Sequence, residues 1–402
     1  MERFQLKNGL TVLFQKNSSD SVALEVMFKV GSNDENPDIL GISHFLEHML
    51  FEGTKKRPDS IIISNEIEKY GAEFNAYTST NRTAFFIKII NKRFDIALDI
   101  LSDMAANPIF RNDKIKKEKN VILREIDMVT DDPRQHQWIL FQKNLFEKHP
   151  AKNPTYGTIK TVSALRRKKL LDYYQKYYVP NNMILSIVGN VQGVKEKAEN
   201  YFGHLKPKNM QKKKEIKEPK QNKIKHFIEK RKIQNSYIVL GYKTVPRLHE
   251  DSYALDVISA VLGRGQSGWI FDEIRNKHGL SYQTGVQTEN EADHGTFAVY
   301  AGLDRKNIEK AKSLVLKQFK RLQKITKTEF NEAKTYIEGH HALQTEDNFH
   351  KADDMAFWEL IKDAGFAESY IKNIRKVAIN DVKKAAKKYL NDNYTFVAIE
   401  QK

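Results

Sequence analysis

Two segments of this 402-residue chain repeat each other at a nearly constant spacing. Residues 178–188 join a tyrosine-containing helix end to an apolar strand, and residues 389–399 repeat this pattern 211 positions later. Gly53 and Gly263, which each follow a predicted helix, lie 210 positions apart. Matching offsets at both ends of the repeat indicate an internal duplication, so we expect the chain to fold as two related halves.

Each predicted half contains two strands, a helix, a strand-rich middle, two helices and a final strand. This order favours an α+β fold in which a mainly antiparallel β-sheet is covered by α-helices. The predicted boundaries are residues 1–205 for the first half, 206–223 for a Lys-rich linker and 224–402 for the second half. The chain is long enough for each half to bury a core of its own.

The linker belongs to a densely basic segment, Lys206 to Lys225, whose acidic residues are Glu215 and Glu218. It reads as a solvated linker, and a patch for an anionic partner is the alternative. The whole chain has a formal net charge of +16, which raises the question of nucleic-acid binding. Lysines elsewhere are interspersed with glutamates, as in residues 114–124, and no aromatic RNA-binding signature occurs, so no nucleic-acid partner is predicted.

The sequence His-Phe-Leu-Glu-His at residues 44–48 places two imidazoles and a carboxylate close together on one predicted helix. His44 and His48 lie about 40° apart around such a helix, one turn above the other, so both rings can reach one metal ion. Glu47 lies on the other side of His44, where its carboxylate can hold a water molecule. The remaining positions are apolar, and a metal ion would compensate the three polar groups in this buried helix.

Two histidines at this spacing also arise by chance or as hydrogen-bonded core residues, so a metal site needs a third ligand. Residues 114–129 form a strong predicted helix, in which Glu118 and Glu125 lie seven positions apart at the edge of an apolar stripe. A carboxylate from this helix, such as that of Glu125, completes a His, His, Glu set and leaves one tetrahedral position for water, as in catalytic zinc sites. Taken alone, each glutamate reads equally well as part of a solvated helix flank.

Four motifs occur here in an order that one known protein family shares. Residues 44–54, His-Phe-Leu-Glu-His-Met-Leu-Phe-Glu-Gly-Thr, resemble the signature of the insulinase/pitrilysin metallopeptidases, whose members include the mitochondrial processing peptidase. Residues 118–125 resemble the helix that carries the family's third ligand, at a similar distance from the first motif. Residues 71–78, Gly-Ala-Glu-Phe-Asn-Ala-Tyr-Thr, resemble its substrate-pairing edge strand, and residues 271–282 resemble the segment with its substrate-contacting Arg and Tyr.

This resemblance implies a processing-peptidase-like fold and a zinc-dependent endopeptidase of the inverted His-x-x-Glu-His type. It implies that zinc-activated water attacks peptides or unfolded segments bound in extended form. One zinc ion is expected per chain. The implied site residues are His44, His48 and Glu125 as metal ligands, Glu47 as general base, Glu118 as a supporting acidic residue, Asn75 and Ala76 in the substrate-binding strand, and Arg275 and Tyr282 as contacts to the substrate backbone.

Members of the resembled family commonly pair at this chain length. A homodimer is therefore expected, and pairing with an inactive sister subunit is the alternative. With an offset of 210, the polar positions of the first motif correspond to Ala254, Val257 and Ile258. The second half thus keeps the helix but replaces its polar arc with core residues, which indicates one catalytic and one degenerate half.

A non-catalytic structural subunit is the main alternative function, since the resembled family contains such members, typically with altered ligands. Here the ligand positions and the Arg/Tyr pair are all present. Residues 263–268 also satisfy the dinucleotide-binding pattern G-x-G-x-x-G, but that pattern carries weight only after a strand. Because residues 254–262 have helical periodicity, we expect a glycine-rich turn there.

The sequence contains no cysteine, which excludes disulfides, thiolate metal sites and a cysteine nucleophile. Its first ten residues alternate like a strand, without the apolar core of a secretory signal. No apolar run approaches the roughly 18 residues that a membrane span needs, so no span is predicted. We therefore expect a cytoplasmic protein, and a periplasmic or organellar setting stays open if a targeting segment was removed.

Overall fold

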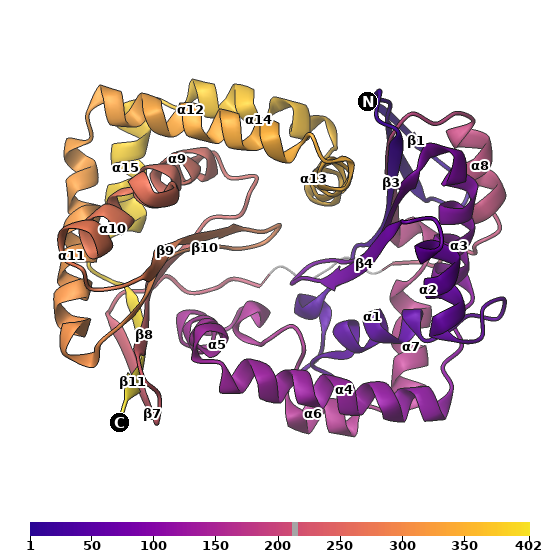
Figure 1. Cartoon of the computed structure of the whole chain (residues 1–402), viewed down its shortest axis with the longest axis horizontal. Coiled ribbons are helices and arrows are strands. Elements are labelled where there is room, and N and C mark those ends of the chain that lie inside the picture. Colours follow the sequence, from indigo (N-terminus) through magenta and orange to yellow (C-terminus); the bar gives the residue numbers. More distant parts are fainter. Residues whose placement is uncertain (211–215) are drawn as a thin grey trace. The chain divides into compact units, whose positions relative to one another are not determined.

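The computed structural model describes residues 1–210 and 216–402, and their contacts divide the chain into two compact units. The predicted α+β class is confirmed, because each unit is built on one β-sheet covered by helices (Figure 1). Neither unit is continuous in sequence. The first unit comprises Met1–Asp127, Asn153–Glu215 and Leu343–Ala367, and the second comprises Met128–Lys152, Ile216–Ala342 and Glu368–Lys402.

The sheet of the first unit has six strands in the order β1-β2-β6-β3-β5-β4. Neighbouring strands run antiparallel, except that β2 and β6 form the one parallel pair among the described strands of this sheet. Strand β4 lies at an edge. The bounds are β1 Glu2–Gln5, β2 Thr11–Gln15, β3 Ser21–Phe28, β4 Glu73–Thr78, β5 Thr83–Ile90 and β6 Met183–Val188.

Helices of the first unit bury the larger of its two cores against one face of this sheet. Leu24 and Val26 of β3 point into this core, where they join Phe45 of α1 and Leu98 of α3. The helices from this part of the sequence are α1 Ile42–Phe51, α2 Ser60–Glu68, α3 Phe94–Ala106, α4 Asn112–Asp131, α6 Ile159–Ala164, α7 Arg167–Tyr177 and α8 Val194–Phe202.

The opposite face of the sheet is covered by α13 (Asn348–Ile361), which comes from the last fifth of the sequence. Its Ala352 and Ala356 are fully buried, in one cluster with Met27 of β3 and Ile184 of β6. Two small residues one turn apart let the helix approach the strands closely. Because both faces of the sheet are covered, β3 is buried on both of its sides, and its residues are apolar apart from Ser21 and the buried Glu25.

The sheet of the second unit has five strands in the order β7-β11-β8-β10-β9. Here β11 and β7 form the one parallel pair among the described strands. The strands are β7 Lys225–Arg231, β8 Ser236–Thr244, β9 Gln283–Asn290, β10 Gly295–Leu303 and β11 Thr395–Gln401. The helices from this part of the sequence are α9 Asp251–Gly263, α10 Trp269–Phe271, α11 Ile308–Arg321, α12 Lys327–Gln344, α14 Gly365–Lys376 and α15 Ile379–Tyr389.

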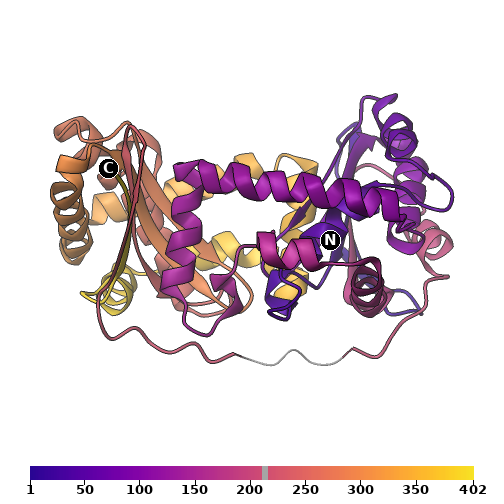
Figure 2. The same ribbon diagram turned by 90° about the horizontal axis from the view of Figure 1, so that it is seen from below.

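Each unit contains one helix that comes from the other half of the sequence. Just as α13 covers the first sheet, α5 (Pro133–Leu145) from the first half of the sequence covers a face of the second sheet (Figure 2). Its Phe141 and Leu145 are buried with Val239 of β8 and Val397 of β11. Each sheet therefore depends on a helix from the other half of the sequence.

The predicted duplication is confirmed by the strand orders. Five strands of the first sheet follow the order β2-β6-β3-β5-β4, and the second sheet follows β7-β11-β8-β10-β9 with its parallel pair in the corresponding place. Helix α9 takes the place of α1 in the sequence, and Ala254, Val257 and Ile258 are buried in it. The glycine-rich residues 263–268 follow a helix and not a strand, so the context of a dinucleotide site is absent from this described stretch.

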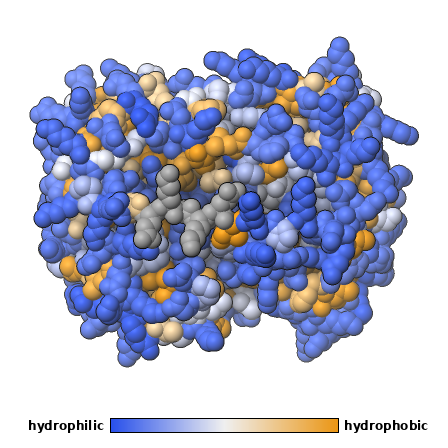
Figure 3. All heavy atoms as spheres, turned by 180° about the vertical axis from the view of Figure 1, so that it is seen from behind, coloured by the Kyte–Doolittle hydropathy of each residue, from blue (hydrophilic) through white to orange (hydrophobic). Residues whose placement is uncertain are grey.

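The predicted linker 206–223 includes residues 211–215, which lie outside the described residues. Its described parts form neither helix nor strand. The two units are defined by contacts and each combines several stretches of sequence, so they do not test the predicted boundaries of the two sequence halves. Those boundaries stay a prediction. Among the described helices, none combines the length and apolar character that crossing a membrane requires. On the face drawn in Figure 3, hydrophilic residues predominate and apolar side chains gather in small separate patches.

Candidate metal centre

Helix α1 carries His44, Glu47 and His48 and begins after a glycine with a left-handed backbone conformation. Gly41 precedes the helix with a φ of 90°, and a Cβ atom there would lie 2.5 Å from the carbonyl oxygen of Tyr156. The buried carboxyl group of Glu35 accepts hydrogen bonds from the N–H groups of Gly41, at 2.6 Å, and Ser43, at 2.8 Å. Burial raises the pKa of Glu35 to about 8. These contacts satisfy the first N–H groups of the helix and fix its direction.

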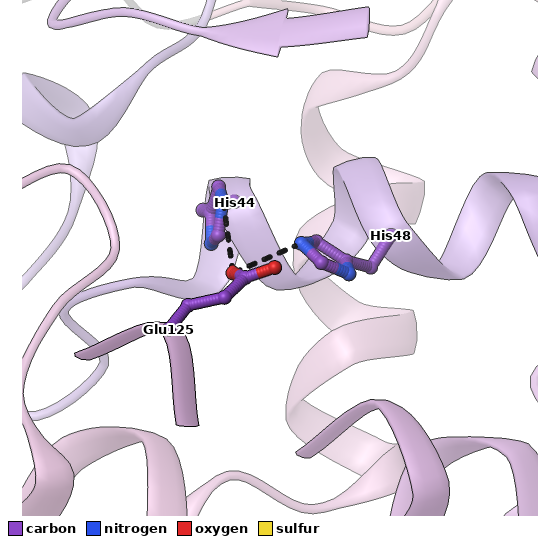
Figure 4. Close-up of side chains that lie close together, drawn as sticks. All are labelled: His44, His48 and Glu125. Carbon is purple, nitrogen blue, oxygen red and sulfur yellow. Dashed lines mark ion pairs between the residues drawn. The ribbon is translucent and has the colours of Figure 1, made fainter. Parts of the chain in front are cut away.

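The two histidine rings stack one turn apart, with centroids 4.7 Å from each other. Glu125 of α4 reaches them from a separate helix (Figure 4). Its Oε2 lies 3.9 Å from Nε2 of His44 and 3.5 Å from Nε2 of His48. The three donor atoms lie within 4.8 Å of one another. Ligand atoms of a tetrahedral zinc ion are about 3.4 Å apart, so the nitrogen and oxygen donors fit a zinc ion in type and in spacing.

His48 lies between two carboxylates. Its Nδ1 is 3.0 Å from Oε2 of Glu118, opposite the Nε2 that faces Glu125. Burial opposes the charged ring, but the hydrogen bonds with Glu118 and Glu125 outweigh it and raise the pKa of His48 to about 9. His44 behaves differently, since burial and the neighbouring His48 lower its pKa to about 4.

The two glutamates of α4 differ in exposure. Glu118 is buried, with 6% of its surface exposed, although the sequence placed it at the edge of the apolar stripe. Lys117 lies 3.2 Å from its Oε1 and neutralises it from the outer side. The side chain of Glu125 is 38% exposed, which leaves solvent access to the His/Glu group.

Glu47 projects beside the histidines and has a partner that the sequence analysis did not identify. The hydroxyl group of Thr78, the last residue of β4, donates a hydrogen bond to Oε2 of Glu47 over 2.5 Å. Burial raises the pKa of Glu47, while this hydrogen bond opposes the rise. Side chains alternate along a strand, so the predicted strand 71–78 already implied that Thr78 and Ala76 share a face.

Among the described residues, β4 pairs with β5 alone, so its other side is a free sheet edge. The N–H of Ser79 donates to the carbonyl oxygen of Arg82, so Ser79 directs its backbone groups at β5. Along an antiparallel pair, residues that direct their backbone groups at the partner strand alternate with residues that direct them away from it. Ala76 is three positions before Ser79, so its N–H and C=O point to the free edge. The side chain of Asn75 accepts a hydrogen bond from that Ala76 N–H at 2.8 Å. Asn75 and Ala76 thus lie together at a strand edge that can accept another strand.

Arg275 and Tyr282 belong to the second unit, apart in sequence from the residues of the first. The guanidinium carbon of Arg275 lies 5.5 Å from the centre of the Tyr282 ring and 4.9 Å from the centre of the Phe271 ring. The side chain of Tyr282 is 87% exposed. The structure therefore brings these two predicted residues together, with Tyr282 exposed and Arg275 partly buried.

A second group with metal-binding residue types lies in the second unit. His149, Asp293 and His294 have donor atoms within 4.8 Å of one another. The N–H of Ala151 donates to Nδ1 of His149 at 3.3 Å, which leaves the ring proton on Nε2, facing Asp293 at 3.5 Å. Nδ1 of His294 lies 2.8 Å from the same carboxylate. Asp293 thus accepts from two imidazoles, and the arrangement fits a hydrogen-bonded cluster better than a set of metal ligands.

Comparison with known proteins agrees with this geometry. Residues 11–159 match the model of the insulinase family, peptidase family M16, and residues 164–337 match the model of the M16 peptidase inactive domain. An uncharacterized zinc protease of Rickettsia felis is 33% identical over 356 residues, which cover 87% of this chain and 85% of that protein. The chain belongs to the M16 peptidase family.

Other relatives cover the M16 chain almost completely. The uncharacterized zinc protease YmxG of Bacillus subtilis is 28% identical over 99% of this chain and 98% of its own length. The crystal structure of a protease from Helicobacter pylori matches with a TM-score of 0.94 at 25% identity, over 99% of both chains. A structure from Pseudomonas fluorescens, described as a peptidase M16 inactive domain, has a TM-score of 0.89 at 21% identity and supports the fold.

Proposed function

We propose that this M16 family member is a zinc-dependent endopeptidase that hydrolyses peptides or unfolded segments bound in extended form. The observation that carries the proposal is the meeting of His44, His48 and Glu125 beside the carboxylate of Glu47. Relatives that cover most of the chain are named zinc proteases, which supports the same activity.

The proposed metal ligands are Nε2 of His44, Nε2 of His48 and Oε2 of Glu125, for one zinc ion per chain. When bound, zinc lowers the pKa of a coordinated water from about 15.7 to about 7 and so supplies a nucleophile. Glu118 holds Nδ1 of His48 and fixes the ring, so that Nε2 keeps its lone pair for the ion.

Glu47 is the proposed general base. Its carboxylate accepts the proton of the attacking water and returns it to the leaving amine. Burial raises the pKa of Glu47 and so makes it a stronger base than an exposed glutamate. A base positioned in this way typically contributes about 10²- to 10⁴-fold to the rate.

The free edge of β4 is the proposed binding place for the substrate backbone. An extended peptide that adds to a sheet edge takes its main-chain hydrogen bonds and presents a regular, unfolded segment to the site. The N–H of Ala76 faces that edge and is covered by the side chain of Asn75, which must release it when a peptide carbonyl takes its place. Arg275 and Tyr282 keep the role that the family resemblance implies, as donors to substrate carbonyl groups.

The test is the Glu47→Gln variant, assayed with a fluorogenic peptide and analysed for bound zinc. We expect it to keep about one zinc per chain and to lose at least about 10²-fold in peptide cleavage, because the ligands stay and the base is removed. Asp127→Asn, on the exposed side of α4, is the matched control and should cleave like the wild type. Full activity of Glu47→Gln would contradict the assigned role.

A non-catalytic structural subunit is the second candidate function. It is favoured by the match of residues 164–337 to a domain model described as inactive and by the apolar residues that replace the ligands in α9. Cleavage that EDTA abolishes and zinc restores would exclude it.

We propose a homodimer as the working assembly, with an inactive sister subunit as the alternative, and sedimentation of the purified chain distinguishes the two.

A further inference from the structure

Thr78 makes a direct contact with the proposed base. Its hydroxyl group donates to Oε2 of Glu47 over 2.5 Å, in a partly buried place. Hydrogen bonds to an ionised carboxylate are shorter and about twice as strong as neutral ones, so this contact fixes the carboxylate. We propose that Thr78 is a positioning residue, which holds Oε2 so that Oε1 of Glu47 is aimed at the attacking water. This inference rests on the proposed function of Glu47.

The strand that carries Thr78 is itself held from its opposite face. Tyr77 points away from Glu47, because neighbouring side chains of a strand alternate. Its hydroxyl group donates to the carboxylate of Asp353 on α13 and accepts a hydrogen bond from Nε of Arg82 at 3.2 Å. The fully buried Glu25 of β3 lies 3.3 Å away on the same side.

Strand β4 therefore contributes both a free backbone edge and the side chain that contacts Glu47. Its backbone at Ala76 faces the free edge, two residues before Thr78 and in the same orientation along the strand. Its side chain at Thr78 sets the carboxylate of Glu47. A peptide that pairs with this edge is therefore positioned by the same strand that orients the carboxylate of Glu47. The position of the substrate backbone relative to the base is then fixed by β4. Preset orientation of this kind lowers the barrier without strengthening substrate binding.

The experiment compares Thr78→Val and Thr78→Ser in the zinc-loaded, full-length protein, with kcat and KM measured separately on a fluorogenic peptide. Valine has nearly the shape of threonine but no hydroxyl group, whereas serine keeps the donor. Thr83→Val is the matched control. Thr83 pairs with Thr78 across the hairpin, but its hydroxyl group donates to the carbonyl oxygen of Val30 at 3.0 Å.

We expect Thr78→Val to lower kcat by roughly ten- to hundredfold, which corresponds to the loss of one hydrogen bond to a charged group. KM and zinc content should stay near the wild-type values, and Thr78→Ser should restore most of the rate. Thr83→Val should leave kcat unchanged. An equal loss in Thr78→Ser, or an equal loss in Thr83→Val, would overturn the proposal, because the hydroxyl contact would then not explain the effect.

Crystal structures of the wild type and Thr78→Val give a second, activity-independent reading. The inference requires one conformation of the Glu47 side chain in the wild type and a displaced or split carboxylate in the variant. An unchanged carboxylate in Thr78→Val would overturn it. If the wild type itself cleaves no peptide, the proposed function fails, whereas the two structures still decide whether Thr78 positions Glu47.

Discussion

Nδ1 of His48 lies 3.0 Å from Oε2 of Glu118, and this contact decides how the ring can act. When the ring gives up its second proton to bind an ion, the proton that stays between these two atoms leaves Nε2 with its lone pair directed to the side where Glu125 lies. His44 has no such support, since its buried Nδ1 has no hydrogen-bond partner among the described residues. The two proposed ligands on α1 are therefore not equivalent, and His48 is the better oriented one.

The first prediction concerns this contact. Glu118→Gln should weaken zinc binding by about tenfold or more, because a neutral partner no longer raises the basicity of the His48 ring. Competition with a chromogenic chelator measures the affinity. Asp127→Asn, an exposed change on the same helix, should leave it unchanged. An affinity of Glu118→Gln equal to that of the wild type would show that His48 is oriented by other means.

The second prediction concerns the number of zinc ions. The wild type should bind one ion per chain, His44→Asn should bind none, and Asp293→Asn should still bind one, because the cluster at Asp293 is held by hydrogen bonds. Elemental analysis after dialysis counts the ions. Added zinc at about a hundred times its Kd should stabilise the wild type and Asp293→Asn by about 2.7 kcal/mol, seen as a rise in Tm. Two ions in the wild type and one in Asp293→Asn would refute the assignment.

The third prediction concerns helix α13. Ala356 is completely buried against the first sheet, so Ala356→Asp would place a charge without a partner in an apolar cluster. The free energy of unfolding should fall by about 3 kcal/mol or more. Urea titration measures it. Ala342→Asp, at an exposed alanine of α12, should cost less than about 1 kcal/mol. Equal losses in the two variants would argue against close packing of α13.

The fourth prediction concerns Glu218, one of the two acidic residues within the Lys-rich segment Lys206 to Lys225. Its carboxylate accepts hydrogen bonds from the N–H groups of residues 147–149 and from the ammonium group of Lys243. Burial opposes ionisation, but these donors lower the pKa of Glu218 from 4.5 to about 2. Because the pKa is lower in the folded state, the stabilisation is complete above about pH 4.5 and is lost as the pH falls towards 2.

Glu218→Gln should therefore lower the free energy of unfolding by about 2 kcal/mol at pH 7, and the difference from the wild type should shrink at pH 3. Urea titrations of both proteins at the two pH values measure this. The comparison between variants removes the contribution of other titrating groups. A difference that is the same at pH 7 and pH 3 would mean that the ionised carboxylate is not what stabilises this contact.

Much of the fold was predictable because its signals are local or repeated. The matching offsets predicted two related halves, and the strand orders of the two sheets confirm them. Helical periodicity predicted the helix that bears Glu118 and Glu125, observed as α4. The burial of Glu118 was not predictable, because its position at the edge of an apolar stripe does not say which neighbour covers it.

The sequence by itself determined that His44, Glu47 and His48 lie close together on one helix, since their order and spacing are local properties of the chain. The tertiary structure decided what stands around that helix. Glu125 approaches from a separate helix, Thr78 reaches Glu47 from an edge strand, and Tyr77 is held by Asp353, 276 residues away in sequence. Such contacts depend on how sheets and helices pack, and local periodicity carries no information about packing between distant segments.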